Sequence, residues 1–280
     1  MWGTHLLPSV GGYELRAITP LIVEDLRREM AAAGVGVQTQ RKALMLLQGI
    51  LRRAVIRELI PANPVSVVDK PRQPPTRRPQ PLAPARVEAI RALLRPRDAT
   101  LVSVLAYGGL RPQEATRARW GDLGDRTLYV HAGKTGRDRV VRLLRPLAQD
   151  LAEWRMLSGR PGDDKLMFPR IQEPQSRPRA TVEWTREDWN NWRGRIYKRA
   201  AVAAGVTGDL RPYRLRGSFV SLLLAEGRTL IYVSGQAGHS VATLAAHYAG
   251  VIEELADRPS LSAEQAILEA RAGRDERKAV

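Results

Sequence analysis

The chain has 280 residues, enough for one large domain or two ordinary ones, and its 44% hydrophobic content is typical of a globular protein. Its 45 Lys and Arg exceed its 29 Asp and Glu, and the net charge of +16 favours a polyanionic partner, nucleic acid before an acidic membrane. The absence of cysteine excludes disulfides, thiolate zinc sites and cysteine nucleophiles. Because there is neither a signal-peptide pattern nor an apolar run of about 18 residues, we expect a cytoplasmic protein with no membrane contact.

The first 69 residues have helical patterns. In "ITPLIVEDLRREMAAAG", Thr19 is a candidate cap, Pro20 lies in the first turn and Gly34 ends the helix. The segment "TQRKALMLLQGILRRAVIREL" places one apolar stripe at helical spacing: Ala43, Leu47, Ile50, Leu51, Ala54 and Val55. Its other face carries Arg41, Lys42, Arg52 and Arg53. That face is either solvated or laid on DNA, and the net charge favours DNA.

Residues 70–84, "KPRQPPTRRPQPLAP", form a basic, proline-rich linker. Prolines favour an extended polyproline conformation, so the segment predicts a stiff connection between residues 1–69 and 85–280. It carries Arg72, Arg77 and Arg78, which we expect to contact DNA phosphates; a solvated linker is the alternative.

Beyond the linker, the patterns predict helices around 84–94 and 98–108 and again from about 146. Between them, "RTLYVHAGKTGRDRVVRLL" predicts a β-hairpin, because β-branched and aromatic residues flank a turn bracketed by glycines. The expected fold is therefore mainly α with a small β-hairpin, which makes the second domain α+β.

Familiar metal and nucleotide sites are missing from the sequence. The four histidines form no ligand pair at i, i+4, and "AGKTGR" lacks the spacing of a phosphate-binding loop. We therefore expect no metal and no cofactor. The remaining candidates are cations and tyrosines, including three arginines around Tyr213 in "DLRPYRLRGSF". Arginines can stabilise the charge that develops when a phosphodiester is cut, and a tyrosine nucleophile would keep the bond energy in a phosphotyrosine.

Four segments, "YGGLRPQE", "GKTGRDRVV", "YRLRGSF" and "GHSVATLAAHY", resemble in order and rough spacing the motifs of the tyrosine recombinases, the phage integrase family. The resemblance covers most of the chain, and the first 75 residues are similar to the family's helical core-binding domain. It implies a clamp around duplex DNA with three parts: a core-type DNA-binding domain at 1–69, the linker, and a catalytic domain with a C-terminal tail helix at 85–280.

The resemblance also implies roles for individual residues. Arg111 and Arg216 match the arginines that clamp the scissile phosphate, and Glu114 matches an acidic position that supports them. Lys134 matches the lysine that protonates the leaving 5′-oxygen. His239 matches the histidine that bonds phosphate and assists proton transfer.

Two tyrosines complete the implied site. Tyr248 matches the nucleophile that attaches to the 3′-phosphate. Tyr213 departs from the family pattern, because the box is usually His-x-x-Arg. A phenol can donate a hydrogen bond to phosphate but is uncharged at neutral pH and is a poor base. We expect an active enzyme in which Tyr213 is a neutral donor; alternatively, its ring only packs.

The implied function is site-specific recombination of a mobile element, by integration or excision, at double-stranded attachment sites. Its partners would be three further copies in a tetramer on synapsed DNA and accessory DNA-bending proteins. Two alternatives remain: relaxation of supercoils by type IB topoisomerase chemistry, and a non-catalytic DNA-binding relic.

The sequence also makes predictions for the first and the last residues of the chain. The opening "HLLPSVGGYEL" corresponds to the start of the core-binding region, so we expect the arm-binding domain of many integrases to be missing. Near the other end, Ser262 and Gln265 form a capping-box pattern, followed by the apolar pair Ile267 and Leu268. The resemblance implies that this tail helix docks on a neighbouring subunit; a frayed tail is the alternative.

Overall fold

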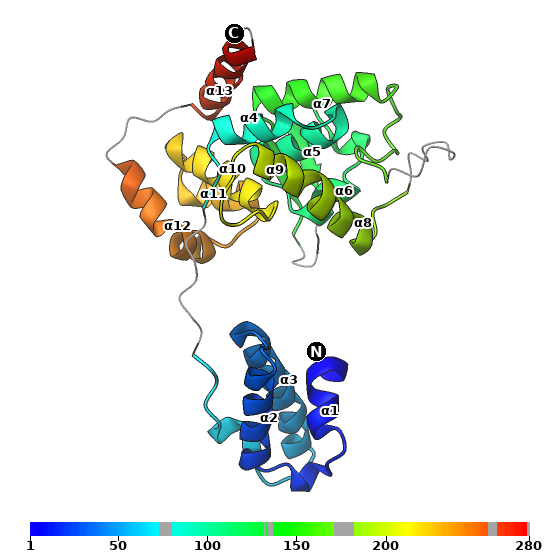
Figure 1. The fold of residues 1–280 in the computed structure, drawn as a ribbon, viewed down its shortest axis with the longest axis vertical. Coiled ribbons are helices and arrows are strands. Elements are labelled where there is room, and N and C mark those ends of the chain that lie inside the picture. Colours follow the sequence, from blue (N-terminus) through cyan, green and yellow to red (C-terminus); the bar gives the residue numbers. More distant parts are fainter. Residues whose placement is uncertain (73–79, 132, 134–136, 171–181, 257–261, 279–280) are drawn as a thin grey trace. The chain divides into compact units, whose positions relative to one another are not determined.

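The computed structural model describes residues 1–72, 80–131, 133, 137–170, 182–256 and 262–278. The chain forms two compact units, Met1–Arg77 and Arg78–Val280 (Figure 1). Within the described ranges, no helix is both long enough and apolar enough to cross a membrane.

The first unit is entirely helical. Its elements are a π-helical turn (Trp2–Leu6), α1 (Leu7–Val10), a 3₁₀ turn (Leu15–Ala17), α2 (Pro20–Ala32), α3 (Val37–Ile56) and a second 3₁₀ turn (Pro64–Val67). The predicted cap is confirmed, because the Thr19 side chain accepts a hydrogen bond from the Ile22 amide. The predicted stripe of α3 is also confirmed: Ala43, Leu47, Leu51 and Ala54 are buried, with Ile50 and Val55 half-buried.

The second unit is mainly helical with one hairpin, as the sequence predicts. Its helices are α4 (Pro84–Ala92), α5 (Pro96–Tyr107), α6 (Pro112–Arg117), α7 (Arg145–Leu157), α8 (Arg186–Asn191), α9 (Lys198–Ala203), α10 (Tyr213–Ala225), α11 (Leu230–Ala237), α12 (Val241–Ala256) and α13 (Ala263–Lys278). A 3₁₀ turn spans Trp120–Asp122, and a π-helical turn spans Trp192–Tyr197. The strands are β1 (Thr127–Val130) and β2 (Arg139–Arg142).

Helix α5 lies at the centre of the second unit. Every residue from Thr100 to Tyr107 is buried, because the helix packs against α4, α7 and α10 on different sides. A helix that is apolar all round cannot lie at a surface, and the run "LVSVLAY" therefore explains this position. The chain leaves α5 through the turn at Gly108 and Gly109 and enters α6 at the candidate site.

The hairpin is antiparallel, and Val130 pairs with Arg139. Side chains alternate between the two faces of a strand, so Arg139 shares a face with Val141, which is fully buried. The Arg139 side chain is accordingly only 9% exposed. The register of β2 therefore directs this arginine into the unit.

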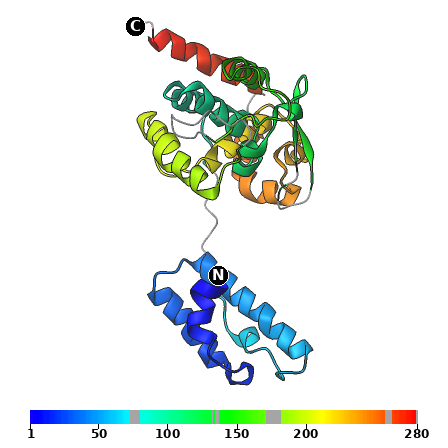
Figure 2. The same ribbon diagram turned by 90° about the vertical axis from the view of Figure 1, so that its right-hand side faces the viewer.

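Helix α13 packs on the second unit of its own chain (Figure 2). Ile267 is fully buried against α4 and α7, whereas Leu268 is 43% exposed. The Arg271 guanidinium bonds the Asp150 carboxylate at 2.7 Å and lies 3.4 Å from Glu88. The described part of the tail is thus a helix docked on its own chain and not a frayed segment, while docking on a neighbouring subunit stays a prediction.

Candidate active site

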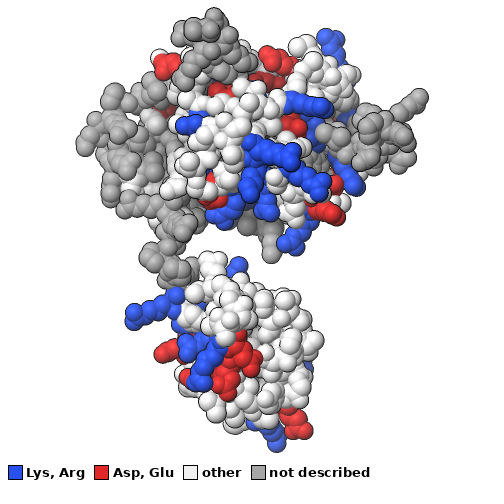
Figure 3. Space-filling view, in the orientation of Figure 1, with Lys and Arg blue, Asp and Glu red and all other residues white. Residues whose placement is uncertain are grey.

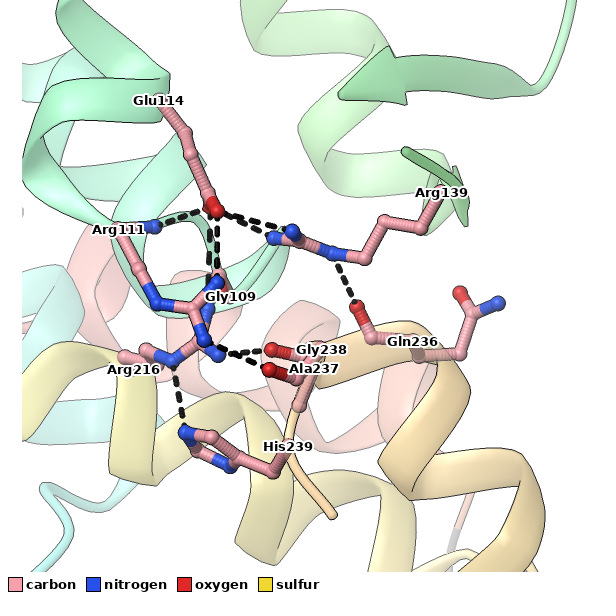
Figure 4. Close-up of polar contacts among 9 residues, drawn as sticks. All are labelled: Gly109, Arg111, Glu114, Arg139, Arg216, Gln236, Ala237, Gly238 and His239. Carbon is pink, nitrogen blue, oxygen red and sulfur yellow. Dashed lines mark hydrogen bonds and ion pairs between the residues drawn. The ribbon is translucent and has the colours of Figure 1, made fainter. Parts of the chain in front are cut away.

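Arg111 lies at the beginning of α6 and is fixed there by its neighbours. Because Pro112 follows, Arg111 is held in an extended conformation, which suits a residue that precedes a helix. Its backbone amide donates to Glu114 Oε2 at 2.7 Å, and its guanidinium donates to Glu114 Oε1 at 2.8 Å and to the Gly238 carbonyl at 2.6 Å. The Arg111 side chain remains 30% exposed. Figure 4 shows its guanidinium bonded to Glu114 and to the Gly238 carbonyl.

Arg216 is held inside the protein. It projects from α10, and its guanidinium donates to the carbonyls of Gly109 and Ala237 and, through Nε, to His239 Nε2 at 3.3 Å. Burial and the nearby charge of Arg111 lower the pKa of Arg216 to about 10. The guanidinium therefore remains charged at neutral pH and supplies a fixed positive charge.

Sequence reasoning missed Arg139, which is a major part of this cluster. Its guanidinium donates to both oxygens of Glu114, at 2.9 and 2.7 Å, and to the Gln236 carbonyl at 3.0 Å. The alternation of side chains in "RVV" could have predicted this position, because it places the arginine on the same face as the buried Val141. We did not expect it, because an arginine near a hairpin turn is usually solvated.

Glu114 is the carboxylate around which the arginines gather. It bonds Arg111 and Arg139, and its Oε2 lies 3.9 Å from Arg216 Nη1 (Figure 4). Burial acts to raise the pKa of Glu114, but hydrogen bonds from Arg139 and Arg111 outweigh that effect and lower the pKa to about 2. The carboxylate is therefore ionised throughout the neutral range, as expected for a supporting group.

His239 follows the left-handed Gly238, which ends α11 at a φ of 61°. Burial and the charges of Arg216 and Arg111 lower the pKa of His239 to about 4, so the ring is neutral at pH 7. Because Nε2 accepts from Arg216, the ring proton lies on Nδ1. That nitrogen is buried and has no hydrogen-bond partner in the described part of the chain.

Tyr248 and Tyr213 lie beside this cluster. Tyr248, on α12, is only 6% exposed, and burial together with the nearby Tyr213 raises its pKa to about 12. A methyl group at Gly217, next to Arg216 in α10, would lie 3.3 Å from the Tyr248 hydroxyl. Tyr213 begins α10 and is 57% exposed.

The other two arginines near Tyr213 have structural contacts. Arg211 forms an ion pair with Asp209 at 2.6 Å. Arg214 donates to the carbonyls of Gln80, Thr207 and Asp209. Of the three arginines around Tyr213, Arg216 is the one that reaches the cluster.

The remaining predicted residues are spread over both units. Lys134, Arg77 and Arg78 fall outside the described residues. Arg41 donates to the Pro71 carbonyl at 2.7 Å, so one of its nitrogens holds the beginning of the linker. Lys42 and Arg72 are exposed.

The second unit also has a basic face, on which Lys and Arg side chains gather (Figure 3). The π-helical turn and α9 of this unit have four exposed cations: Arg193, Arg195, Lys198 and Arg199. The first unit contributes exposed Lys42, Arg52 and Arg53 along one face of α3. Both units therefore present cations from consecutive helical turns, an arrangement suited to a polyanion.

Comparison with known proteins identifies the family of this chain. Residues 82–254 match the model of the phage integrase family. A tyrosine recombinase of Pseudothermotoga lettingae is 24% identical over 249 residues, which cover 86% of this chain and 81% of that protein. The match extends over more than half of the chain, so the chain belongs to the phage integrase family, the tyrosine recombinases, a class of DNA strand-transferring enzymes.

Solved structures share the fold. A lambda integrase dimer bound to a core site superimposes with a TM-score of 0.70 at 15% identity, covering 91% of this chain and 86% of the other. A lambda integrase tetramer bound to a Holliday junction gives a TM-score of 0.66 at 16% identity, covering 83% of this chain and 65% of the other.

Proposed function

We propose that the protein is a site-specific DNA recombinase that cuts and rejoins DNA through a 3′-phosphotyrosine on Tyr248, in the integration or excision of a mobile element. The observation that carries the proposal is the convergence of Arg111, Arg216 and His239 beside Tyr248. These residues come from α6, α10 and the loop before α12, which are far apart in sequence. Two fixed guanidinium groups beside a tyrosine are the parts that metal-free phosphodiester cleavage requires.

The two arginines would have different roles in this reaction. The Arg111 side chain is 30% exposed and that of Arg216 only 2%, so the guanidinium of Arg111 would bond the scissile phosphate directly. Arg216 is bonded to two backbone carbonyls and to His239, so it would act mainly as a fixed charge that stabilises the transition state. His239 would bond a phosphate oxygen through Nδ1–H once the site opens to DNA, since this nitrogen is buried and has no partner among the described residues.

The Tyr248 proton must leave during attack. With a pKa of about 12, the hydroxyl is protonated at neutral pH, so its proton would pass to water as the bond from its oxygen to phosphorus forms and the bond from phosphorus to the 5′-oxygen breaks. The positive charges of Arg111 and Arg216 would favour this ionisation. After attack, Lys134 would protonate the leaving 5′-oxygen, and a 5′-hydroxyl from a partner strand would reverse the step.

The remainder of the chain would hold the DNA. Residues 1–69 would form a core-type DNA-binding domain, and residues 70–84 a linker whose arginines contact phosphates. Four copies would act together on two synapsed sites, a proposal supported by the lambda integrase tetramer on a Holliday junction. Accessory DNA-bending proteins would complete the assembly.

Covalent trapping tests this function. A nicked suicide substrate from the junction DNA flanking the gene is incubated with the protein in EDTA, quenched with SDS and resolved by electrophoresis. We expect a shifted band that disappears in Tyr248→Phe. DNA binding without this band would contradict the enzyme and favour the relic.

A second assay separates recombination from topoisomerase activity. Two-site plasmids should give exchanged products, whereas a plasmid without the site should retain its supercoils. Relaxation of both plasmids without exchange would identify the topoisomerase alternative.

A further inference from the structure

Gly217 lies in the interior of α10, where glycine is unfavourable. Glycine costs about 0.5–1 kcal/mol relative to alanine inside a helix, since it loses more backbone entropy on folding. The residue is buried and belongs to the helix Tyr213–Ala225. Its backbone has ordinary helical angles, because it is not among the glycines with positive φ. The reason for a glycine here must therefore be close packing.

Two groups pack against this glycine. A Cβ at residue 217 would lie 3.3 Å from the Tyr248 hydroxyl oxygen and 3.9 Å from both Cα and Cβ of Pro81. The first distance is tighter than an ordinary van der Waals contact, so any side chain would press on the hydroxyl. We call this arrangement of Gly217, Pro81 and Tyr248 the Gly217 contact.

The segment Gln80–Leu82, the linker end, is fixed to the same helix on both sides of Pro81. Arg214 Nε donates to the Gln80 carbonyl at 2.6 Å, and the Leu82 amide donates to Ser218 Oγ at 2.9 Å. Leu82 is 6% exposed and belongs to the core of the second unit. The chain that leads from the linker is thus bonded to α10 on both sides of Pro81, and Pro81 packs at the same glycine as the Tyr248 hydroxyl.

We propose that the linker end is a positioning segment for Tyr248: with Gly217 it holds the hydroxyl in a buried resting position, which the tyrosine must leave to attack a phosphate. The inference rests on the proposed role of Tyr248 as nucleophile. It follows from access, because only 6% of Tyr248 is exposed and its hydroxyl packs at the buried Gly217, so a phosphate of a duplex has little access to it. Loosening the linker end or filling the Gly217 contact should therefore expose Tyr248.

Tyrosine acylation measures this exposure without requiring activity. The protein alone is treated with N-acetylimidazole, and peptides are analysed by mass spectrometry over time. Tyr213, which is 57% exposed, serves as the reactive reference, and the buried Tyr107 and Tyr197 report on folding. In the unaltered protein we expect Tyr248 to react far more slowly than Tyr213. Equal rates would overturn the proposal.

One substitution loosens the linker end, and the other fills the Gly217 contact. Ser218→Ala removes the hydrogen bond to Leu82, and Gly217→Ala places a methyl group against the hydroxyl. We expect each to raise the acylation rate of Tyr248 about fivefold, which corresponds to about 1 kcal/mol and to the loss of one hydrogen bond. The matched control is Ser221→Ala, one turn further along α10, because Ser221 Oγ is buried without a hydrogen-bond partner among the described residues.

The proposal fails if both variants acylate at the unaltered rate while Tyr107 and Tyr197 stay protected. If Gly217→Ala loses that protection, Pro81→Gly tests the same contact from the linker side, and its failure to expose Tyr248 would count equally against the proposal.

Cleavage of the suicide substrate gives the second readout. If release of Tyr248 precedes attack, Ser218→Ala should form covalent complex faster than the Ser221→Ala control. Slower formation, with Tyr248 more exposed, would contradict the resting position. Absence of covalent complex in every variant would refute the proposed function but leave the acylation result valid, so the two failures are distinguishable.

Discussion

Glu114 is the buried carboxylate that contacts all three arginines of the cluster. Its side chain is 5% exposed and contacts Arg111, Arg139 and Arg216. Because its pKa falls from 4.5 to about 2 on folding, the folded state binds the carboxylate proton less tightly than the unfolded chain does. The stabilisation is complete above about pH 4.5 and is lost as the pH falls towards 2.

We expect Glu114→Gln to lower the free energy of unfolding by about 3 kcal/mol at pH 7, because three cations lose their buried partner. The difference from the unaltered protein should shrink between pH 4.5 and 2.5. Urea denaturation across this range measures it. Glu24→Gln, which removes an exposed ion pair with Arg28, should change stability by less than about 0.5 kcal/mol. A pH-independent loss in Glu114→Gln would contradict the assigned ionisation.

Tyr213 tests whether a phenol can replace the family's usual histidine. If its hydroxyl donates to a phosphate oxygen, Tyr213→Phe should slow covalent complex formation by roughly tenfold or more, since a hydrogen bond to a charged group contributes about 1.5–3 kcal/mol. DNA affinity, measured by electrophoretic mobility shift, should change little. Tyr13→Phe, exposed in the first unit, is the control. Full activity in Tyr213→Phe would leave the ring with a packing role only.

At the scale of elements, the turn between α5 and α6 links the core to the site. Gly109 has a φ of 61°, and its carbonyl accepts a hydrogen bond from Arg216. A Cβ there would overlap Cδ1 of Phe219 on α10. Glycine is therefore required twice, for the left-handed backbone and for the close approach of the aromatic ring.

We expect Gly109→Ala to lower the free energy of unfolding by at least about 2 kcal/mol, through backbone strain and steric overlap with Phe219. Gly194→Ala is the matched control, because a Cβ at that helical position meets nothing within 4 Å, and it should be neutral or slightly stabilising. Thermal unfolding of the two variants gives the comparison. Similar midpoints would show that the turn can relax.

At the scale of the whole molecule, the net charge of +16 governs the encounter with DNA. Each phosphate that the protein neutralises releases counterions. The logarithm of the binding constant should therefore fall by about 0.9 per phosphate for each unit of log salt concentration.

Arg72→Gln should lower this salt slope by about 0.9 if Arg72 contacts a phosphate. Arg28→Gln should leave it unchanged, because that guanidinium already pairs with Glu24 and Asp25. Fluorescence anisotropy from about 50 to 200 mM salt measures both slopes. An unchanged slope in Arg72→Gln would favour the solvated linker.

Local patterns were sufficient to predict much of this fold. Thr19 and Pro20 begin α2, the apolar stripe of α3 faces the core, and alternating residues around a glycine-rich turn form the hairpin. These features depend only on residues a few positions apart, so they can be predicted from the sequence. The motif order also placed Arg111, Arg216, His239 and Tyr248 in one family pattern.

Tertiary structure decided how the candidate site is assembled. Arg139 and Arg111 meet at Glu114, Arg216 donates to carbonyls on α11 and in the α5–α6 turn, and Arg214 holds the linker end. Each contact joins segments distant in the chain, and a charged residue has the same local pattern whether it is solvated, paired or buried. The sequence by itself therefore determined the elements, the family and the chemical groups, whereas packing around α5 and α10 determined which of those charges face one another.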